Sequence, residues 1–193
     1  FIENIKEIAD SLLAAAELIA DADVWYSLAT VSLRYNWTRP VVTSECDFDV
    51  TGGRHPVIEY VLRTRADNFV KNDCNLGGCP IALLTGPNMA GKSTYLRQNA
   101  LLVVLTHMGC FVPATRACIG ICDQLFSRVG ASDNLAAGQS TFMVEMAETA
   151  NILNRATDKS FIIFDEIGRG TATYDGMAIA QAVLEYLNTL GAR

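Results

Sequence analysis

The most informative segment of this 193-residue chain reads Gly86-Pro87-Asn88-Met89-Ala90-Gly91-Lys92-Ser93. It fits the pattern GxxxxGK[ST], in which glycines let the backbone curl so that successive N–H groups point at phosphate oxygens. The apolar run at 81–85 predicts a buried strand before the loop, and residues 93–108 predict a helix after it, with its positive end toward the same oxygens. This strand–loop–helix context predicts a nucleotide-binding loop.

The side chains of this loop predict its ligands. Lys92 would reach the β- and γ-phosphates, the Ser93 hydroxyl would bind Mg²⁺, and Thr94 would add a phosphate contact. We therefore expect ATP or ADP with Mg²⁺. The nucleotide would be held by Gly86, Pro87, Asn88, Met89, Ala90, Gly91, Lys92, Ser93 and Thr94.

Two acids follow a second apolar run. Phe161–Phe164 predicts a buried strand, and Asp165 and Glu166 come directly after it. Because ligands collect at the carboxyl ends of strands in open α/β sheets, we expect Asp165 to hold Mg²⁺ together with Ser93. Glu166 fits the base that activates the attacking water. The alternative is a strand that runs into an exposed acidic turn.

The remaining sequence predicts the architecture around these segments. Apolar residues recur every three or four positions through 1–35, which predicts one long N-terminal helix that ends before Pro40. The other expected elements are short strands in 41–50, a loop at 72–80 and amphipathic helices at 140–156 and 177–190. This alternation predicts an α/β fold with a mostly parallel sheet flanked by helices.

Composition limits the classes of function. Fifteen Lys and Arg against 21 Asp and Glu give a net charge of −6, which disfavours a broad face that grips nucleic-acid phosphates. Six Cys without a CxxC pair, and two His, favour free thiols in a reducing compartment over disulfides or zinc. No membrane-length apolar run or signal peptide is visible, so we expect a cytoplasmic chain without membrane contact.

A third segment, Leu135–Thr141, is rich in small residues and leads into the helix expected from residue 140. Its position predicts a second anion site at a helix N-terminus, and the alternative is an ordinary helix entry capped by Ser140. The segment resembles the signature loop of the ABC ATPases. In those proteins the loop completes the nucleotide site of a partner across a dimer.

Several segments together resemble the MutS family of DNA mismatch repair ATPases. They are Thr85–Tyr95, Gly138–Met146 and Phe164–Thr171, with Gly53–Glu59 as a further family segment. The resemblance covers nearly the whole chain and implies a P-loop ATPase domain of ABC type at 39–193, truncated at its C-terminus. Residues 1–38 would be the end of a lever helix region. The start at Phe1 and the end at Arg193 also predict a piece of a longer protein.

The resemblance implies roles for single residues. Asn88 would touch the γ-phosphate, Phe69 would stack on adenine, and Ser140 would reach the γ-phosphate bound by the other subunit. Catalysis would thus rest on Lys92, Ser140 and Glu166. A position in the hydrophobic core is the alternative for Phe69.

Partners are implied in the same way. We expect a homodimer through the ATPase domain, mismatched duplex DNA bound by domains absent from this chain, and a downstream MutL-type repair protein. Residues 169–175 would lie at the dimer contact, and His55 would have a structural role. The family usually has Thr-Ser-Thr where this chain has Thr171-Ala172-Thr173, which puts one contact at the dimer seam in doubt.

Three other hypotheses stay open at this point. Another ABC-type ATPase, such as a transporter or RecF/SMC-like subunit, is disfavoured by Asn88-Met89 and by Ser140-Thr141-Phe142. A MutS paralogue without a repair function is the second. The third is a nucleotide-gated binding module with negligible hydrolysis in isolation, because half of each active site would come from a partner.

Overall fold

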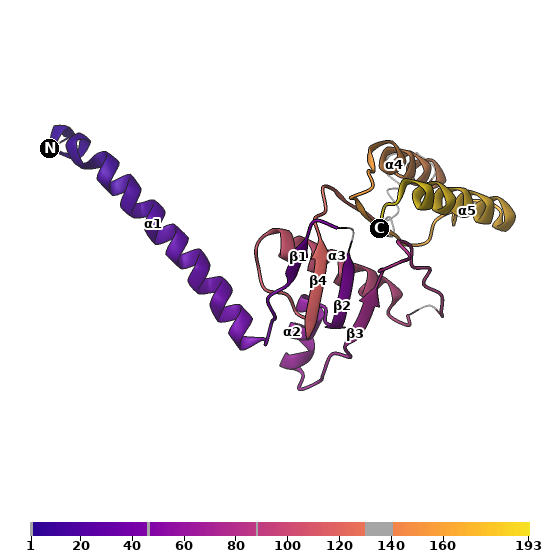
Figure 1. The fold of residues 1–193 in the computed structure, drawn as a ribbon, viewed down its shortest axis with the longest axis horizontal. Helices are drawn as coiled ribbons and strands as arrows, with labels where there is room; N and C mark the ends of the chain where they lie inside the picture. Colours follow the sequence, from indigo (N-terminus) through magenta and orange to yellow (C-terminus); the bar gives the residue numbers. More distant parts are fainter. Residues whose placement is uncertain (1, 46, 88, 130–140) are drawn as a thin grey trace.

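A computed structural model describes residues 2–45, 47–87, 89–129 and 141–193 (Figure 1). The helices are α1 (Ile2–Arg34), α2 (Pro56–Thr64), α3 (Lys92–His107), α4 (Thr141–Arg155) and α5 (Thr173–Leu190). The strands are β1 (Val41–Thr43), β2 (Phe48–Gly53), β3 (Asn72–Asn75), β4 (Arg116–Gly120), β5 (Leu125–Arg128) and β6 (Phe161–Phe164). In Figure 1, α1 projects away from the body, and α4 and α5 lie together on the opposite side of the sheet.

The larger sheet is mixed, so the prediction of a mostly parallel sheet of ABC-ATPase type is wrong. Its four strands have the order β1-β4-β2-β3, in which β1 and β4 are parallel while β2 is antiparallel to both of its neighbours. Along β2, buried Phe48 and Val50 alternate with the more exposed Asp49 and Thr51. Such alternation is typical of antiparallel sheets with one solvated face. The alternation in 48–51 indicates an antiparallel strand. The prediction of a parallel sheet followed instead from the strand–helix alternation later in the chain.

A separate parallel pair carries the acidic strand end. β5 and β6 pair in register from Leu125 opposite Phe161 to Arg128 opposite Phe164. On the other edge of β6, the Ile162 N–H donates to the Arg193 carbonyl, and the Arg193 N–H donates to the Ser160 carbonyl. The strand expected at Phe161–Phe164 is therefore present and has hydrogen-bond partners on both edges.

The strand expected at 81–85 is absent. Among the described residues, the backbone groups of Ala82, Leu83, Leu84 and Thr85 take part in no backbone hydrogen bond, and the segment has no strand assignment. β3, in contrast, forms where a loop was expected, at Asn72–Asn75. A short apolar run thus did not by itself determine which segments pair.

β6 separates two hydrophobic cores. Phe161 and Ile163 face the first, which lies between the larger sheet and α3, and the Phe161 and Phe48 rings are 5.0 Å apart. Ile162 and Phe164 face the second, which lies under α5 and α4. Because successive side chains of a strand point to opposite faces, four consecutive apolar residues suit a strand that is covered on both sides.

The base of α1 is fixed to the body by a buried arginine. The helix ends at Arg34, and Asn36 adopts the left-handed region with φ 51°. Arg54, which directly follows β2, donates from Nη2 to the carbonyls of Tyr35 and Asn36, each at 3.0 Å. Its Nε pairs with Glu59 of α2 at 3.1 Å. Arg54 therefore joins α1, β2 and α2 at one point.

Most of the apolar side chains of α1 from residue 8 onward are exposed to solvent. They include Ile8, Leu12, Leu13, Leu18, Ile19, Val24, Trp25, Tyr26 and Leu33. Despite this, no helix in the described part of the chain has both the length and the apolar content that crossing a bilayer would need.

Candidate functional site

The described residues of the phosphate-loop motif lead directly into α3. Gly86 has φ 146° and Gly91, the N-cap of α3, has φ 93°. No neighbouring atom would contact an added Cβ at either position, so the backbone conformation and not crowding explains these glycines. Lys92 begins the helix, and its Nζ donates to the carbonyls of Gly86 at 2.7 Å and Pro87 at 2.8 Å. The ammonium therefore lies over its own loop.

The loop and the acidic strand end meet through one hydrogen bond. The Ser93 hydroxyl donates to Asp165 Oδ2 at 2.5 Å, although the two residues are 72 positions apart. The Asp165 N–H in turn donates to the Arg128 carbonyl at 2.8 Å, which fixes the residue at the end of β6. The structure thus brings together the two residues predicted to hold Mg²⁺.

These two oxygens fit what Mg²⁺ requires. Mg²⁺ usually takes one or two protein oxygens and completes its shell with water and substrate phosphates. A hydroxyl and a carboxylate in contact beside a phosphate loop provide that set. Within the described residues there is no cluster of three or more His, Cys, Asp or Glu that would form an all-protein cage.

Glu166 follows Asp165 in an unusual backbone conformation. Its φ is 61°, and its half-exposed carboxylate forms an ion pair with Arg169 Nη1. A positive φ is uncommon for a residue with a side chain, and it turns the chain sharply away from the direction of β6. The Glu166 side chain is therefore accessible at the strand end, with its charge partly balanced by Arg169.

A cavity of about 380 Å³ joins Phe69 to the phosphate loop. Its lining comprises Phe69, Asn72, Leu84, Thr85, Ala90, Gly91, Lys92, Thr94 and Tyr95. Phe69 is half-buried at the wall of this cavity, not in either hydrophobic core. Phe69 therefore lines the same cavity as Gly91, Lys92 and Thr94, and its stacking role stays a prediction.

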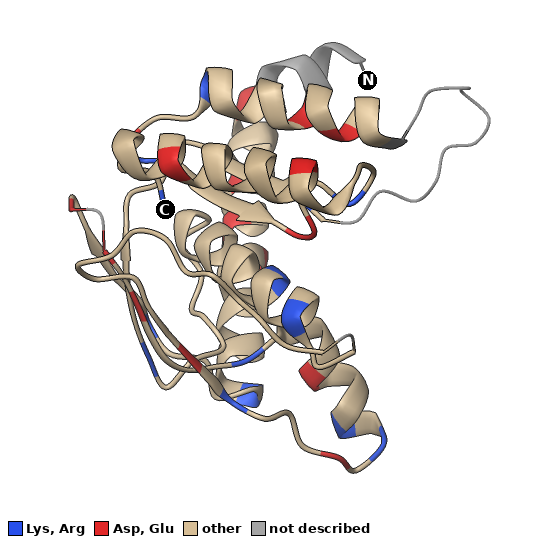
Figure 2. Cartoon of the chain, turned by 90° about the vertical axis from the view of Figure 1, so that its right-hand side faces the viewer, with Lys and Arg blue, Asp and Glu red and all other residues tan. Residues whose placement is uncertain are grey.

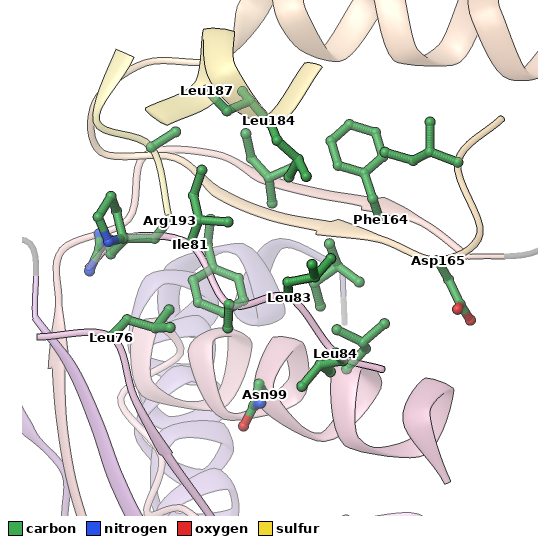
Figure 3. Close-up of a pocket in the computed structure, with 18 of the residues that line it drawn as sticks. Leu76, Ile81, Leu83, Leu84, Asn99, Phe164, Asp165, Leu184, Leu187 and Arg193 are labelled. Carbon is green, nitrogen blue, oxygen red and sulfur yellow. The ribbon is translucent and has the colours of Figure 1, made fainter. Parts of the chain in front are cut away.

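A second cavity of about 380 Å³ separates residues 81–84 from β6. Figure 3 shows Leu83 and Leu84 on one side of it, with Leu184 and Leu187 of α5 above and Asp165 at one end. The lining is mostly aliphatic and aromatic, and it continues the second hydrophobic core. This apolar space lies where the expected strand at 81–85 would otherwise approach β6.

Two predicted site residues lie outside the described residues: Asn88 and Ser140. The segment Leu135–Thr141 also falls outside them except for Thr141, its last residue, at which α4 begins. Their predicted roles stay predictions.

The alanine of Thr171-Ala172-Thr173, where the family usually has serine, lies at the start of α5, a position that the sequence did not predict. Ala172 is the N-cap of α5, with φ −60° and ψ 145°, and it provides no side-chain hydrogen bond to the helix. Ser is among the preferred N-cap residues because its hydroxyl accepts from a free N–H of the first turn. The N-cap residue of α5 therefore leaves the N–H groups of the first turn without a side-chain acceptor of its own.

Sequence reasoning gave no role to Glu145 or Arg128, two charged residues that are buried beside the acidic strand end. Glu145 lies in α4 between apolar Val144 and Met146, close to the stripe of Phe142, Met146 and Thr149. A charged residue beside the apolar stripe of a helix is the signal that could have identified it, since buried charges are rare unless paired.

Burial alters three titratable groups around the loop and α2. Burial raises the pKa of the Cys74 thiol, and also raises the pKa of Tyr95 well above its usual range. The Tyr95 hydroxyl donates to the Asp73 carbonyl at 2.9 Å. Burial first, and then the charge of Arg97, lower the pKa of His55, whose Nδ1 accepts the Ile58 N–H as the N-cap of α2. This cap is the structural role expected for His55.

Charged residues are distributed over many elements. In Figure 2, Lys and Arg lie on several different elements and are interspersed with Asp and Glu. The expectation that this chain does not grip a phosphate backbone across a broad face stays a prediction from its net charge of −6.

Comparison with known proteins gives a consistent result. A family model described as MutS domain V matches residues 82–192. The chain is 56% identical to a DNA mismatch repair protein MutS of Zymomonas mobilis, over 99% of this chain and 22% of the relative. Relatives with the same name from Dinoroseobacter shibae and a Ruegeria species are 57% and 58% identical, over 92% and 95% of this chain and 21% of each relative.

The chain thus spans about a fifth of the length of the curated relatives it matches. The matched domain ends one residue before Arg193 and leaves α1, β1, β2, α2 and β3 outside it. Of the four strands of the mixed sheet, only β4 lies within the matched domain. The mixed sheet remains the observation that corrects the expected mostly parallel sheet of ABC type.

Proposed function

This chain belongs to the MutS family, and on that premise we propose that it binds Mg²⁺–ATP at the 86–94 loop and hydrolyses it, as the nucleotide module of a DNA mismatch repair protein. The observation that supports this most directly is the cavity that Phe69 shares with Gly91, Lys92 and Thr94. An aromatic face and a phosphate loop on one cavity suit a nucleotide, which has a base to stack and phosphates to bind.

Binding would begin with an exchange of partners at Lys92. In the free chain its ammonium donates hydrogen bonds to the Gly86 and Pro87 carbonyls, which carry no net charge. Phosphate oxygens carry full charge, so they would replace these carbonyls, while N–H groups of the loop and of the first turn of α3 bind the same phosphates. Phe69 would stack on the base at the other end of the cavity.

Ser93 and Asp165 would hold the Mg²⁺ that accompanies the triphosphate. Their contact at 2.5 Å would open so that both oxygens face the metal. When bound, the metal neutralises charge that develops on the β- and γ-phosphate oxygens. Asp165 is kept in place for this role by the hydrogen bond from its N–H to Arg128.

Hydrolysis would rest on Glu166 and Lys92. The Glu166 carboxylate would accept a proton from the attacking water, whose oxygen bonds to the γ-phosphorus while the bond from that phosphorus to the β–γ bridging oxygen breaks. ADP then leaves with the electron pair of the broken bond, and Lys92 stabilises the charge. Ser140 from a second copy would add a donor to the γ-phosphate, which makes a homodimer part of the proposal.

The role in mismatch repair would be a conformational one. Mismatched duplex DNA and a MutL-type partner would be bound by other parts of the longer protein. ATP occupancy at this module would change contacts between subunits, because a ligand shifts an equilibrium only when it binds the two states differently.

Lys92→Ala tests the nucleotide site. We expect at least a roughly 100-fold loss of Mg²⁺–ATP affinity by calorimetry, because a charge that faces phosphates in a partly dry site contributes several kcal/mol. Lys159→Ala removes the same charge from an exposed turn before β6 and should leave the affinity unchanged. Equal affinities of the wild type and Lys92→Ala would refute the proposed site.

A binding module with negligible hydrolysis is the second candidate. The ion pair between Arg169 and Glu166 favours it, since the carboxylate that should accept the proton is already engaged. The rate of phosphate release per chain, measured against chain concentration, separates the two functions. A rate that rises with concentration supports hydrolysis in a dimer, while a flat rate near zero supports the binding module.

A further inference from the structure

Glu145 is a buried carboxylate with no role in the chemistry described so far. Its residue is 4% exposed, and its Oε1 accepts the backbone N–H of Gly168 at 2.5 Å. Its Oε2 lies 3.9 Å from Nη2 of Arg128, whose side chain is also buried. The carboxylate therefore connects the second turn of α4 to the turn that follows Glu166.

That turn is constrained on its other sides as well. Gly168 has φ 78°, and an added Cβ there would come within 2.6 Å of the Gly176 carbonyl oxygen at the start of α5. At Gly170 an added Cβ would lie 2.8 Å from the Phe142 Cβ of α4. The chain from Glu166 to Gly170 is thus packed between two helices, and Glu145 provides its charged anchor.

Arg128 links this anchor to the other end of the same segment. Its carbonyl accepts the Asp165 N–H at 2.8 Å, while its guanidinium faces Glu145 and pairs with the half-exposed Glu148 at 3.1 Å. Asp165 is therefore held through the backbone of Arg128, and Gly168 through the side chain of Glu145. Glu166, with its φ of 61°, lies between these two fixed points.

We propose that Glu145 is a positioning residue for the hydrolytic step: it fixes the 165–170 turn so that the Glu166 carboxylate is directed at the attacking water. This inference rests on the proposed function, since it concerns the same acidic strand end. Glu145 itself touches neither nucleotide nor water in this role.

The physical argument is one of geometry. A hydrogen bond from a backbone N–H to a buried carboxylate is short and strong, and its removal leaves the N–H without a partner. Gly168 would then be free to change its backbone angles, and Glu166 would move with the turn. A displacement of about 1 Å at a reacting group can reduce a rate by roughly 100-fold.

The test compares three variants by their kcat and by their affinity for Mg²⁺–ATP. Glu145→Ala should lower kcat by about 10- to 100-fold while Kd for Mg²⁺–ATP changes less than about threefold, the pattern of an interaction that matters only in the transition state. Glu145→Gln keeps an oxygen for the Gly168 N–H and should recover most of the lost rate. Glu148→Ala is the matched control, because it also removes a partner of Arg128 but leaves the Gly168 bond intact.

A spectroscopic measurement gives a second readout that does not depend on turnover. The Gly168 amide proton, bonded to a carboxylate, should exchange slowly and resonate at low field in the wild type and in Glu148→Ala. In Glu145→Ala it should exchange at least about 10-fold faster, as expected when local opening becomes easier. Glu145→Gln should retain slow exchange.

The outcomes separate this inference from the proposed function. Unchanged kcat in Glu145→Ala, or a Glu148→Ala variant that loses as much rate, overturns the positioning role. If Glu145→Ala loses affinity and rate together and melts below the assay temperature, Glu145→Gln decides: a rate as low as that of Glu145→Ala in a folded protein also overturns it. A wild type that binds Mg²⁺–ATP through Lys92 but does not hydrolyse it removes the positioning role and leaves the nucleotide site standing.

Discussion

Two short apolar segments of this molecule have different structures. Phe161–Phe164 forms β6, paired on one edge with β5 and on the other with Arg193, and covered on both faces. Residues 81–85, with four apolar residues and a threonine, have no strand partner among the described residues, and Leu83 is 74% exposed. An apolar run therefore indicates a tendency to be buried, while strand formation depends on a neighbour that offers hydrogen bonds.

Composition explains part of the difference. β6 contains only Phe and Ile, which favour the pleated, half-buried surface of a sheet, whereas 82–84 is Ala-Leu-Leu, which suits a helix equally well. The rest of the difference is tertiary. β5 supplies a parallel ladder for β6, and the space beside 81–84 is an apolar cavity of about 380 Å³ with no strand in it.

The largest expected contrast comes from truncating one residue in each segment. Ile163 is 3% exposed, so Ile163→Ala should lower the free energy of unfolding by about 2–5 kcal/mol through lost burial and a residual cavity. Leu83→Ala should change it by less than about 0.5 kcal/mol. Urea unfolding at one pH measures both.

If Leu83→Ala lowers the free energy of unfolding as much as Ile163→Ala, the proposed difference between the two segments is wrong. It would mean that residues 81–85 are packed in solution as tightly as β6. The m-value of each variant should match that of the wild type, because a changed slope would indicate altered compactness and not lost packing.

A smaller effect is expected from capping the helix that covers β6. Ala172→Ser should stabilise the chain by about 0.5–1.5 kcal/mol, because a serine hydroxyl at the N-cap of α5 can accept a free N–H of the first turn. Ala82→Ser makes the same chemical change in the exposed segment and should have no measurable effect. Thermal unfolding followed by circular dichroism reads both, and equal shifts in the two variants would show that the cap is not the cause.

The smallest expected effect is on how the free energy of unfolding changes with pH. It should not alter the difference in stability between the Ile163 and Leu83 variants. Because burial lowers the pKa of His55 in the folded chain, the unfolded chain takes up the proton first as pH falls below about 6.5. The free energy of unfolding should therefore decrease between pH 7 and pH 5. His55→Asn keeps an N-cap acceptor for α2 and should flatten this slope, and an unchanged slope would assign it to other groups.

The sequence predicted the local elements better than their arrangement. α1, α3, α4, α5 and β6 lie within a few residues of their expected positions. Each is bounded by local signals, such as the glycines before α3, the acids after β6 and Gly191 after α5. The prediction of a mostly parallel sheet was wrong because long-range pairing decides the direction of each strand. β3 and β4 are short and contain polar or small residues such as Asn72, Asp73 and Gly120, so they carry little local signal.

The candidate site shows the same division. The contact between Ser93 and Asp165 could be anticipated, because the loop motif and the acidic strand end each require a place near phosphate. Glu145 and Arg128 could not be assigned in the same way. The roles of Glu145 and Arg128 depend on their burial and on the hydrogen bond from the Gly168 N–H to Glu145. The spacing of residues in the sequence predicts neither.

The attachment of α1 at its base has a mechanical consequence. The helix has 33 residues, so it is about 50 Å long at 1.5 Å per residue, and Arg54 holds only its base through the Tyr35 and Asn36 carbonyls. A tilt of about 5° at that base would displace the far end by about 4 Å, more than the length of a hydrogen bond. Small rotations of the body, too slight to disturb its own core, would thus be amplified into movements of atomic size at the tip of the helix.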